Sequence, residues 1–163
     1  MGVSKEKRLK AAYGSSGLKR GPSARRIPTA ACRDVEERLL DRRLTFRFDC
    51  LDLAPDCPWS LASVAPSDLA DLLSKLREFE NITVGEIRRK DSQAFKEYPD
   101  FARCPNREAQ RRLAACYEMQ GDSVARLRLG GRKRLYGFLV EHEFHLLWWD
   151  PNHEVWPSEP RHT

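Results

Sequence analysis

The chain has 163 residues, of which 40% are hydrophobic and 33% are charged. This composition suits one domain of ordinary size with a tail, and no segment approaches the roughly 20 apolar residues that a membrane-spanning helix needs. The basic residues near the N-terminus are not followed by an apolar stretch, so no secretory signal is expected and a cytoplasmic location is predicted.

The net charge of +5 comes from the N-terminal tail. Residues 1–26 hold eight basic residues and one acidic residue, a net charge of +7, which leaves 21 basic and 23 acidic residues for positions 27–163. Residues 1–30 are rich in Gly, Ser, Lys and Arg and have too little apolar surface to fold, so a disordered basic tail is predicted. Two roles fit this tail equally well: an electrostatic arm for nucleic acid, or a solubilising or mis-assigned N-terminus.

The cysteines argue against both a disulfide framework and a metal site. There are five of them, an odd number without a CxxC pair, and no export signal accompanies them. His142 and His145 are three residues apart, and on a strand this spacing sends them to opposite faces. No metal and no cofactor are therefore predicted, and Cys50 and Cys116 are interpreted as small core residues.

The first predicted elements are a linker, a strand and two helices. Residues 31–43 are predicted as a linker with one short helix, and residues 44–53 alternate apolar and polar side chains, which indicates a half-buried strand. A proline-containing loop follows. Ser67 or Asp68 is then expected to cap a long amphipathic helix whose apolar stripe runs from Leu69 to Phe79. Thr83 and Glu86 predict a capping box at the start of a second, short helix.

The second half predicts one helix and three strands. Residues 91–105 are expected to be irregular, and Asn106 is expected to cap a helix at 107–118 that ends at Gly121-Asp122. Residues 124–129, 133–140 and 144–149 are predicted strands, with a tight turn at Gly130-Gly131 and a second turn at 141–143. Strands linked in this way form an antiparallel meander.

These elements predict an α+β fold: a small antiparallel sheet with the helices on one face, formed by residues 44–157 and followed by a polar C-terminal tail at 158–163. The other face would carry Arg126, Arg128 and either Lys133 or Arg134. Arginine forks on a sheet bind phosphate well. An antiparallel sheet with one solvated face nevertheless carries charges there without any function, so the pattern alone does not decide.

Several motifs point to a family. They are the strand-helix-helix-three-strand order, Arg126-Leu127-Arg128 before a glycine hairpin, Lys133-Arg134-Leu135-Tyr136 after it, and the terminal His153-Glu154-Val155-Trp156. Together they resemble the RelE/ParE toxin superfamily, although Trp156 stands where a tyrosine is usual. More closely, residues 44–88 and 124–157 resemble a poorly characterised family of small bacterial proteins, and Asp150-Pro151-Asn152-His153 is the most specific part of that resemblance.

The resemblance implies an RNA-cutting site that needs no metal. A 2′-hydroxyl would attack the neighbouring phosphate, with His153 as the acid/base and Arg134 or Lys133 stabilising the phosphorane. Arg126 and Arg128 would bind phosphate, and Trp156 would stack on a base. Each residue also has a structural interpretation. Asp150 and Pro151 form a turn that His153 could simply brace, and Trp156 could cover the sheet edge.

Three functions therefore remain open at this stage. The first is a toxin-like endoribonuclease that cleaves mRNA, free or on the ribosome, and is neutralised by an antitoxin protein. The second is a binding module on the same scaffold, since ParE-like proteins act on a protein target and fold does not fix function. The third is a nucleic-acid-binding accessory protein led by the basic tail.

Overall fold

The computed structural model describes residues 38–89, 92–117 and 123–157. The basic tail at 1–30, most of the predicted linker, the Gly121-Asp122 helix stop and the tail at 158–163 lie outside the described residues. Residues 38–40 are helical, in line with the short helix expected there. Within the described residues, no helix has the length and apolar character needed to cross a bilayer.

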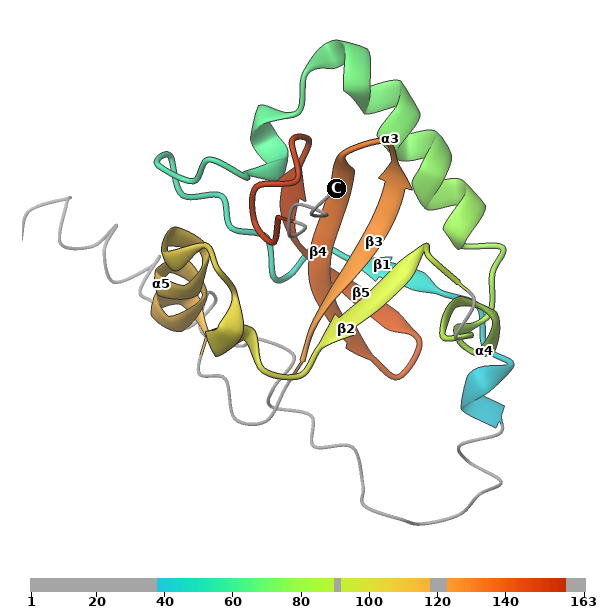
Figure 1. Cartoon of the computed structure of the whole chain (residues 1–163). Helices are drawn as coiled ribbons and strands as arrows, with labels where there is room; N and C mark the ends of the chain where they lie inside the picture. Colours follow the sequence, from blue (N-terminus) through green and yellow to red (C-terminus); the bar gives the residue numbers. More distant parts are fainter. Residues whose placement is uncertain (1–37, 90–91, 118–122, 158–163) are drawn as a thin grey trace, which may run out of the picture.

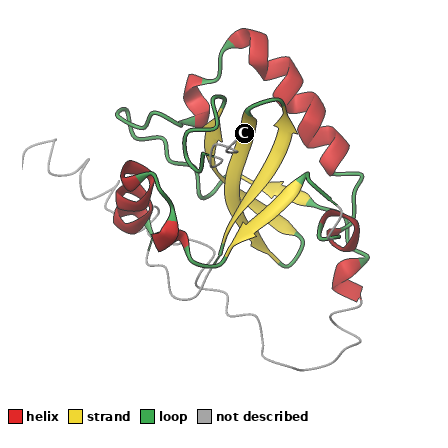
Figure 2. Ribbon diagram, in the orientation of Figure 1, coloured by secondary structure: helices red, strands yellow, loops and turns green. Residues whose placement is uncertain are grey.

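One five-stranded sheet forms the centre of the fold, in the order β1-β5-β4-β3-β2 (Figure 1). The strands are β1 Thr45–Arg47, β2 Phe95–Tyr98, β3 Val124–Gly130, β4 Lys133–Val140 and β5 Glu143–Asp150. β1 pairs with β5 in parallel, and every other neighbouring pair is antiparallel. The predicted α+β class and the β3-β4-β5 meander are therefore confirmed, and Figure 2 shows the strands grouped between the helices.

Two turns close the meander. Gly130 and Gly131 have φ values of 133° and 49°, which glycine adopts at no steric cost, so the tight hairpin falls where the sequence predicts it. At the second turn Glu141 has a φ of 57°. Between these turns the β4–β5 register shifts next to Gly137. This bulge places Leu147 and Trp148 on the same side of β5, where both join one core cluster.

Helices α3 (Pro66–Phe79) and α4 (Val84–Ile87) cover one face of the sheet. Their core contains the alternate β3 residues Ala125, Leu127 and Leu129. The cap residue of α3 is Ala65, which makes no side-chain bond, because Pro66 already occupies the first helical position. The prediction of Ser67 or Asp68 as the cap was therefore wrong. The capping box of Thr83 and Glu86 is present as predicted.

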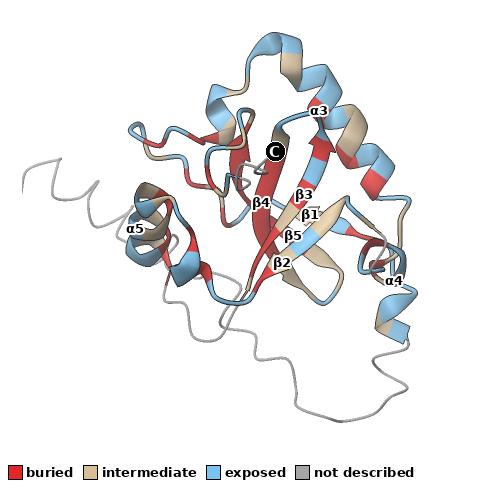
Figure 3. Cartoon of the chain, viewed as in Figure 1, coloured by how far each residue is buried: buried red, intermediate tan, exposed pale blue. Residues whose placement is uncertain are grey.

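Helix α5 (Arg107–Cys116) lies on the other face, so the helices are not confined to one side of the sheet as expected. Its residues Ala109 and Leu113 pack in a second core cluster with Tyr136 and Trp148. The physical reason lies in β4 itself. Leu135 and Tyr136 point to opposite faces and neither is exposed, so both faces need a cover (Figure 3). Asn106 caps α5 as predicted, by accepting bonds from two backbone N–H groups.

The remaining differences from the predicted elements lie at the sheet edges and in the loops. Alternation predicted a strand through residue 53, but β1 ends at Arg47 and Phe48 is 58% exposed. β2 falls in the segment 91–105 that was expected to be irregular, and it pairs with β3. Two short 3-10 helices complete the fold, η2 at Leu61–Ser63 and η3 at Phe101–Arg103.

Candidate functional site

Three arginines gather on the α5 side of the sheet, and they are called the cation cluster here: Arg126, Arg128 and Arg134. The strand register brings them together, because Arg128 lies directly opposite Arg134 and Arg126 lies opposite Tyr136. Directly opposed residues hold their Cβ atoms about 5 Å apart on the same face. The two faces of β3 thus differ sharply, with arginines on one and apolar residues that pack under α3 on the other.

The cluster contains buried polar atoms without partners. Arg134 is only 6% exposed, and its Nη1 donates to the carbonyl oxygens of Gly131 and Lys133 at 2.8 and 2.9 Å. Within the described residues, Nε of Arg134, Nε of Arg126 and the hydroxyl of Tyr136 are buried and have no hydrogen-bond partner. Each such atom costs about 1–3 kcal/mol when unsatisfied. All three of these atoms carry a hydrogen that an oxygen of a bound anion could accept.

The described residues leave the positive charge of the cluster without an ion-pair partner. In the described part of the chain, no carboxylate forms an ion pair with Arg126, Arg128 or Arg134. Asp150 lies opposite Arg134 in the register, but its two oxygens accept the backbone N–H groups of Glu154 and Val155, each at 2.9 Å. Burial, and then the charges of Arg126 and Arg128, lower the pKa of Arg134. Arginine nevertheless stays charged at neutral pH.

His153 shares this electrostatic environment. It sits in the turn held by Asp150, and its φ of 65° is a left-handed conformation that non-glycine residues adopt rarely and at a cost. Burial, and then the charge of Arg134, lower the pKa of His153, while Asp150 partly opposes them. Arg126 and Arg128 lower this pKa further. The lowered pKa favours the neutral form of the imidazole, which is the form that can accept a proton.

Comparisons with models of protein families, with curated proteins and with solved structures find no match.

Aromatic side chains border the cluster. The ring of Trp156 stacks on Tyr98, with ring centroids 4.1 Å apart and an interplanar angle of 20°, and Phe101 meets it edge-on. One face of the indole is therefore covered by the protein, and only the partly exposed remainder is available to a ligand. Lys96 adds a fourth cation beside Arg126, its partner across β2 and β3, with its Nζ 4.9 Å from the centre of the Tyr98 ring.

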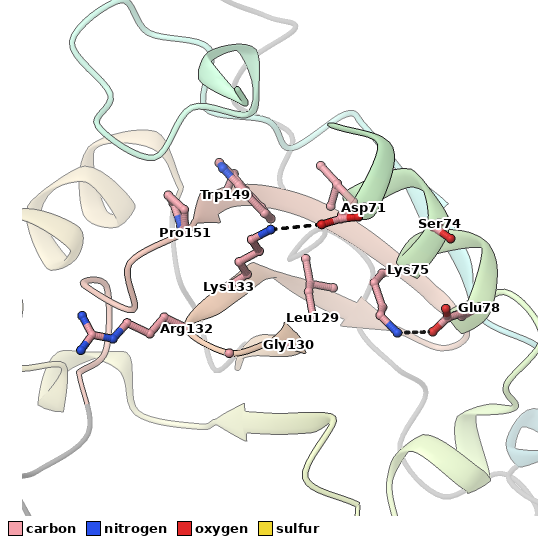
Figure 4. A pocket seen from close by; sticks show the side chains of 12 residues that line it. Asp71, Ser74, Lys75, Glu78, Leu129, Gly130, Arg132, Lys133, Trp149 and Pro151 are labelled. Carbon is pink, nitrogen blue, oxygen red and sulfur yellow. Dashed lines mark hydrogen bonds and ion pairs between the residues drawn. The ribbon is translucent and has the colours of Figure 1, made fainter. Parts of the chain in front are cut away.

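Lys133 does not belong to the site. It lies on the α3 face, where its Nζ contacts Asp68 at 2.8 Å and Asp71 at 3.3 Å. Figure 4 shows this ion pair inside an open groove of about 590 Å³ between α3 and the β3–β4 hairpin. The sequence left Lys133 and Arg134 as alternatives, because a shift of one residue reverses the face of a strand. The register places Arg134 with the other arginines and removes Lys133 from the proposed chemistry.

Three residues at the cation cluster were not predicted as site residues: Tyr136, Tyr98 and Lys96. Tyr136 was detectable, because it alternates with Arg134 along β4 and so must share its face. Tyr98 and Lys96 were not, since β2 has only four residues and stands next to Pro99. The other predicted site residues, Asp150 and Pro151, belong to the turn that carries His153, and the carboxylate of Asp150 holds that turn.

Proposed function

We propose that this chain is a metal-independent endoribonuclease that cleaves mRNA at the cation cluster. The observation that carries the proposal is that His153 lies within the electrostatic influence of three arginines, two of which have a buried Nε without a hydrogen-bond partner within the described residues. Phosphodiester cleavage needs both kinds of group at one phosphate. The proposal would place the protein in the cytoplasm, where its substrate is.

The reaction would use the 2′-hydroxyl of the substrate as the nucleophile. Nε2 or Nδ1 of His153 takes the proton of this hydroxyl, and the 2′-oxygen forms a bond to the adjacent phosphorus. Arg134 and Arg126 donate to the phosphorane oxygens, on which negative charge builds. The bond to the 5′-oxygen then breaks, and this oxygen takes a proton from water. The hydroxide that is left accepts the proton held by His153, which returns to its starting form. The products are a 2′,3′-cyclic phosphate and a 5′-hydroxyl end.

A cleavage assay on purified protein tests this mechanism. The full chain is incubated with mRNA, with and without ribosomes, and with EDTA in both cases. We expect cleavage that persists in EDTA, products with 5′-hydroxyl ends, and no cutting where the attacking nucleotide is 2′-deoxy. His153→Ala should reduce the rate by about 100-fold or more, as removal of a general base usually does.

A charge-matched control separates the site from general basicity. Arg132 is exposed on the β3–β4 turn and is one of the residues that line the groove in Figure 4. Arg132→Gln should leave cleavage unchanged, whereas Arg134→Gln should remove most of it. Intact RNA under all conditions, or equal losses in both arginine variants, would contradict the proposal.

A toxin-like role is part of the same proposal and rests on the family resemblance alone. We expect expression of the chain in bacteria to arrest growth, His153→Ala to relieve the arrest, and an antitoxin protein encoded nearby to neutralise the wild type. Growth that is unaffected by an RNA-cutting chain would separate the enzyme from the toxin.

A binding module is the second candidate function, and one observation favours it. The site offers one histidine for two proton transfers, and the pKa values of Tyr98 and Tyr136 are raised by burial, so neither tyrosine is a ready acid. A module would hold RNA or a protein phosphate without cutting it. In that case His153→Ala would retain binding while Arg134→Gln would lose it. Deletion of residues 1–26 tests whether the basic tail adds a salt-dependent contribution to binding.

A further inference from the structure

A second group of side chains with ligand chemistry lies at the opposite end of the same sheet face. Asp49 and Cys50 follow β1, and His145 projects from β5 beside them. We propose that Asp49, Cys50 and His145 bind a zinc-type divalent cation that ties the segment after β1 to the sheet. This site does not depend on the proposed function.

The spacing of the three side chains suits a metal ion. One ligand atom from each, a carboxylate oxygen, a thiol sulfur and a ring nitrogen, all lie within 4.8 Å of one another. In a tetrahedral zinc site with bonds of about 2.0–2.3 Å, ligand atoms are about 3.3–3.8 Å apart. Nδ1 of His145 and Oδ1 of Asp49 are closer than that, at 2.7 Å, because they now face each other directly. Asp49 is exposed and can move outward, which would open this pair to the distance between two zinc ligands.

The environment of His145 is that of a metal ligand. Its side chain is 6% exposed, and its Nε2 is buried without a hydrogen-bond partner within the described residues. A ligating histidine usually donates its other ring N–H to a carboxylate, which fixes the ring. Glu143 stands next to it, with its Oε2 3.9 Å from Nε2. With Nδ1 on the cation, Nε2 carries the proton and points it towards that carboxylate.

The ligand types select the class of cation. A thiolate and an imidazole favour zinc and its neighbours over magnesium or calcium, which prefer oxygen alone. The Asp49 side chain is 49% exposed, so a cation can enter from that side and water from solvent would supply the fourth ligand.

The site is separate from the cation cluster. His145 pairs with Phe138 on β4, four residues beyond Arg134, which corresponds to about 13 Å along a strand. The bound cation would therefore not contact the phosphate held by the arginines. Its role is structural, because it joins Asp49 and Cys50, which lie beyond the last residue of β1, to the inner strand β5.

Cobalt spectroscopy on the full chain tests the site. Reduced protein, stripped with a chelator, is titrated with Co²⁺ and then with Zn²⁺, and its melting temperature is measured with each. We expect a thiolate-to-cobalt absorption band that zinc abolishes, one equivalent of metal at saturation, and a higher melting temperature. EDTA should reverse the rise in melting temperature and leave any RNA cleavage intact, so the two proposals fail separately.

Two variants and two controls decide the outcome. Asp49→Asn keeps a hydrogen bond to His145 but weakens the ligand set, and Cys50→Ser removes the thiolate, so both should lose the band and the thermal shift. Cys116→Ser and Cys32→Ser should keep both signals. Absence of the band in the wild-type chain would overturn the site. Retention of the band in Cys50→Ser, or its loss in Cys32→Ser, would do the same by placing the metal elsewhere.

Discussion

Replacing Asp150 with asparagine is the sharpest test of how the turn holds His153. The Asp150 side chain is completely buried, and each of its oxygens accepts one backbone N–H, from Glu154 and from Val155, at 2.9 Å. Asparagine keeps one acceptor and turns an NH₂ group towards the other N–H. One charge-assisted bond, worth about 1.5–3 kcal/mol, is lost, and a buried donor is left unpaired at a cost of about 1–3 kcal/mol. Because these contributions overlap, we expect a loss of about 3 kcal/mol in the free energy of unfolding.

Urea denaturation followed by tryptophan fluorescence measures this loss, since Trp148 and Trp149 are buried in opposite core clusters. The midpoint should fall while the slope with urea stays constant, which marks a change in stability alone. Asn152→Ala is the matched control. Its side chain is exposed in the same turn and makes one long bond, at 3.4 Å, to Glu154, so its effect should stay within about 0.5 kcal/mol.

A second readout follows from charge. The negative charge of Asp150 raises the pKa of His153 against the stronger effects of burial and Arg134. Asp150→Asn should therefore lower this pKa further in the protein that remains folded. A loss of stability below about 1 kcal/mol would refute the claim that the hydrogen bonds of Asp150 stabilise the turn. A rise in the pKa of His153 would refute the claim that the charge of Asp150 raises this pKa.

Three further outcomes are expected. The pKa of His153, measured by NMR, should lie below the ordinary value of about 6.5 and should rise in Arg134→Gln. Because the pKa is lower in the folded state than in the unfolded state, the stability that this group contributes is present at pH values above the unfolded-state pKa. This stability is lost as the pH falls through the folded-state pKa. An unchanged pKa in the variant would contradict this. Leu127→Ala should cost about 2–5 kcal/mol, since Leu127 is fully buried under α3, and a calorimetric loss below 1 kcal/mol would be inconsistent with that packing. Gly137→Ala should cost at least about 3 kcal/mol, because the added Cβ would collide with the carbonyl oxygen of His145, whereas Gly85→Ala meets backbone only at 3.1 Å and should cost less.

The meander was predictable because its signals are local. Alternation in residues 124–129 and 133–140, with Gly130-Gly131 between them, decides both the strands and the face on which Arg126 and Arg128 lie. The edge strands were not predictable in the same way. β1 is held by pairing with β5, almost 100 positions later, and β2 by pairing with β3, so neither needs a strong pattern of its own.

The site was predictable in part. The arginines and the histidine could be predicted as site residues from their residue types and from the turn motif. The choice between Lys133 and Arg134 could not, because a shift of one residue in the strand register reverses the face of each side chain. In the structure, Asp68 and Asp71 of α3 form ion pairs with Lys133 and so hold it on the α3 face. These contacts join residues far apart in the sequence, so a local sequence pattern does not reveal them. The same holds for His145, since Asp49 comes from an element 96 residues earlier.

The position of β5 inside the sheet has a consequence for how the protein is made. β5 is the last strand to be synthesised, yet it lies between β1 and β4, and Phe46 of β1 reaches the sheet only through its partner Phe144. At roughly 5–20 residues per second, a ribosome needs about 5–20 s to add the intervening residues. During this interval β1 has no neighbour to pair with, and the turn that carries His153 does not exist. Any activity of the His153 turn therefore begins only after translation of the domain is finished.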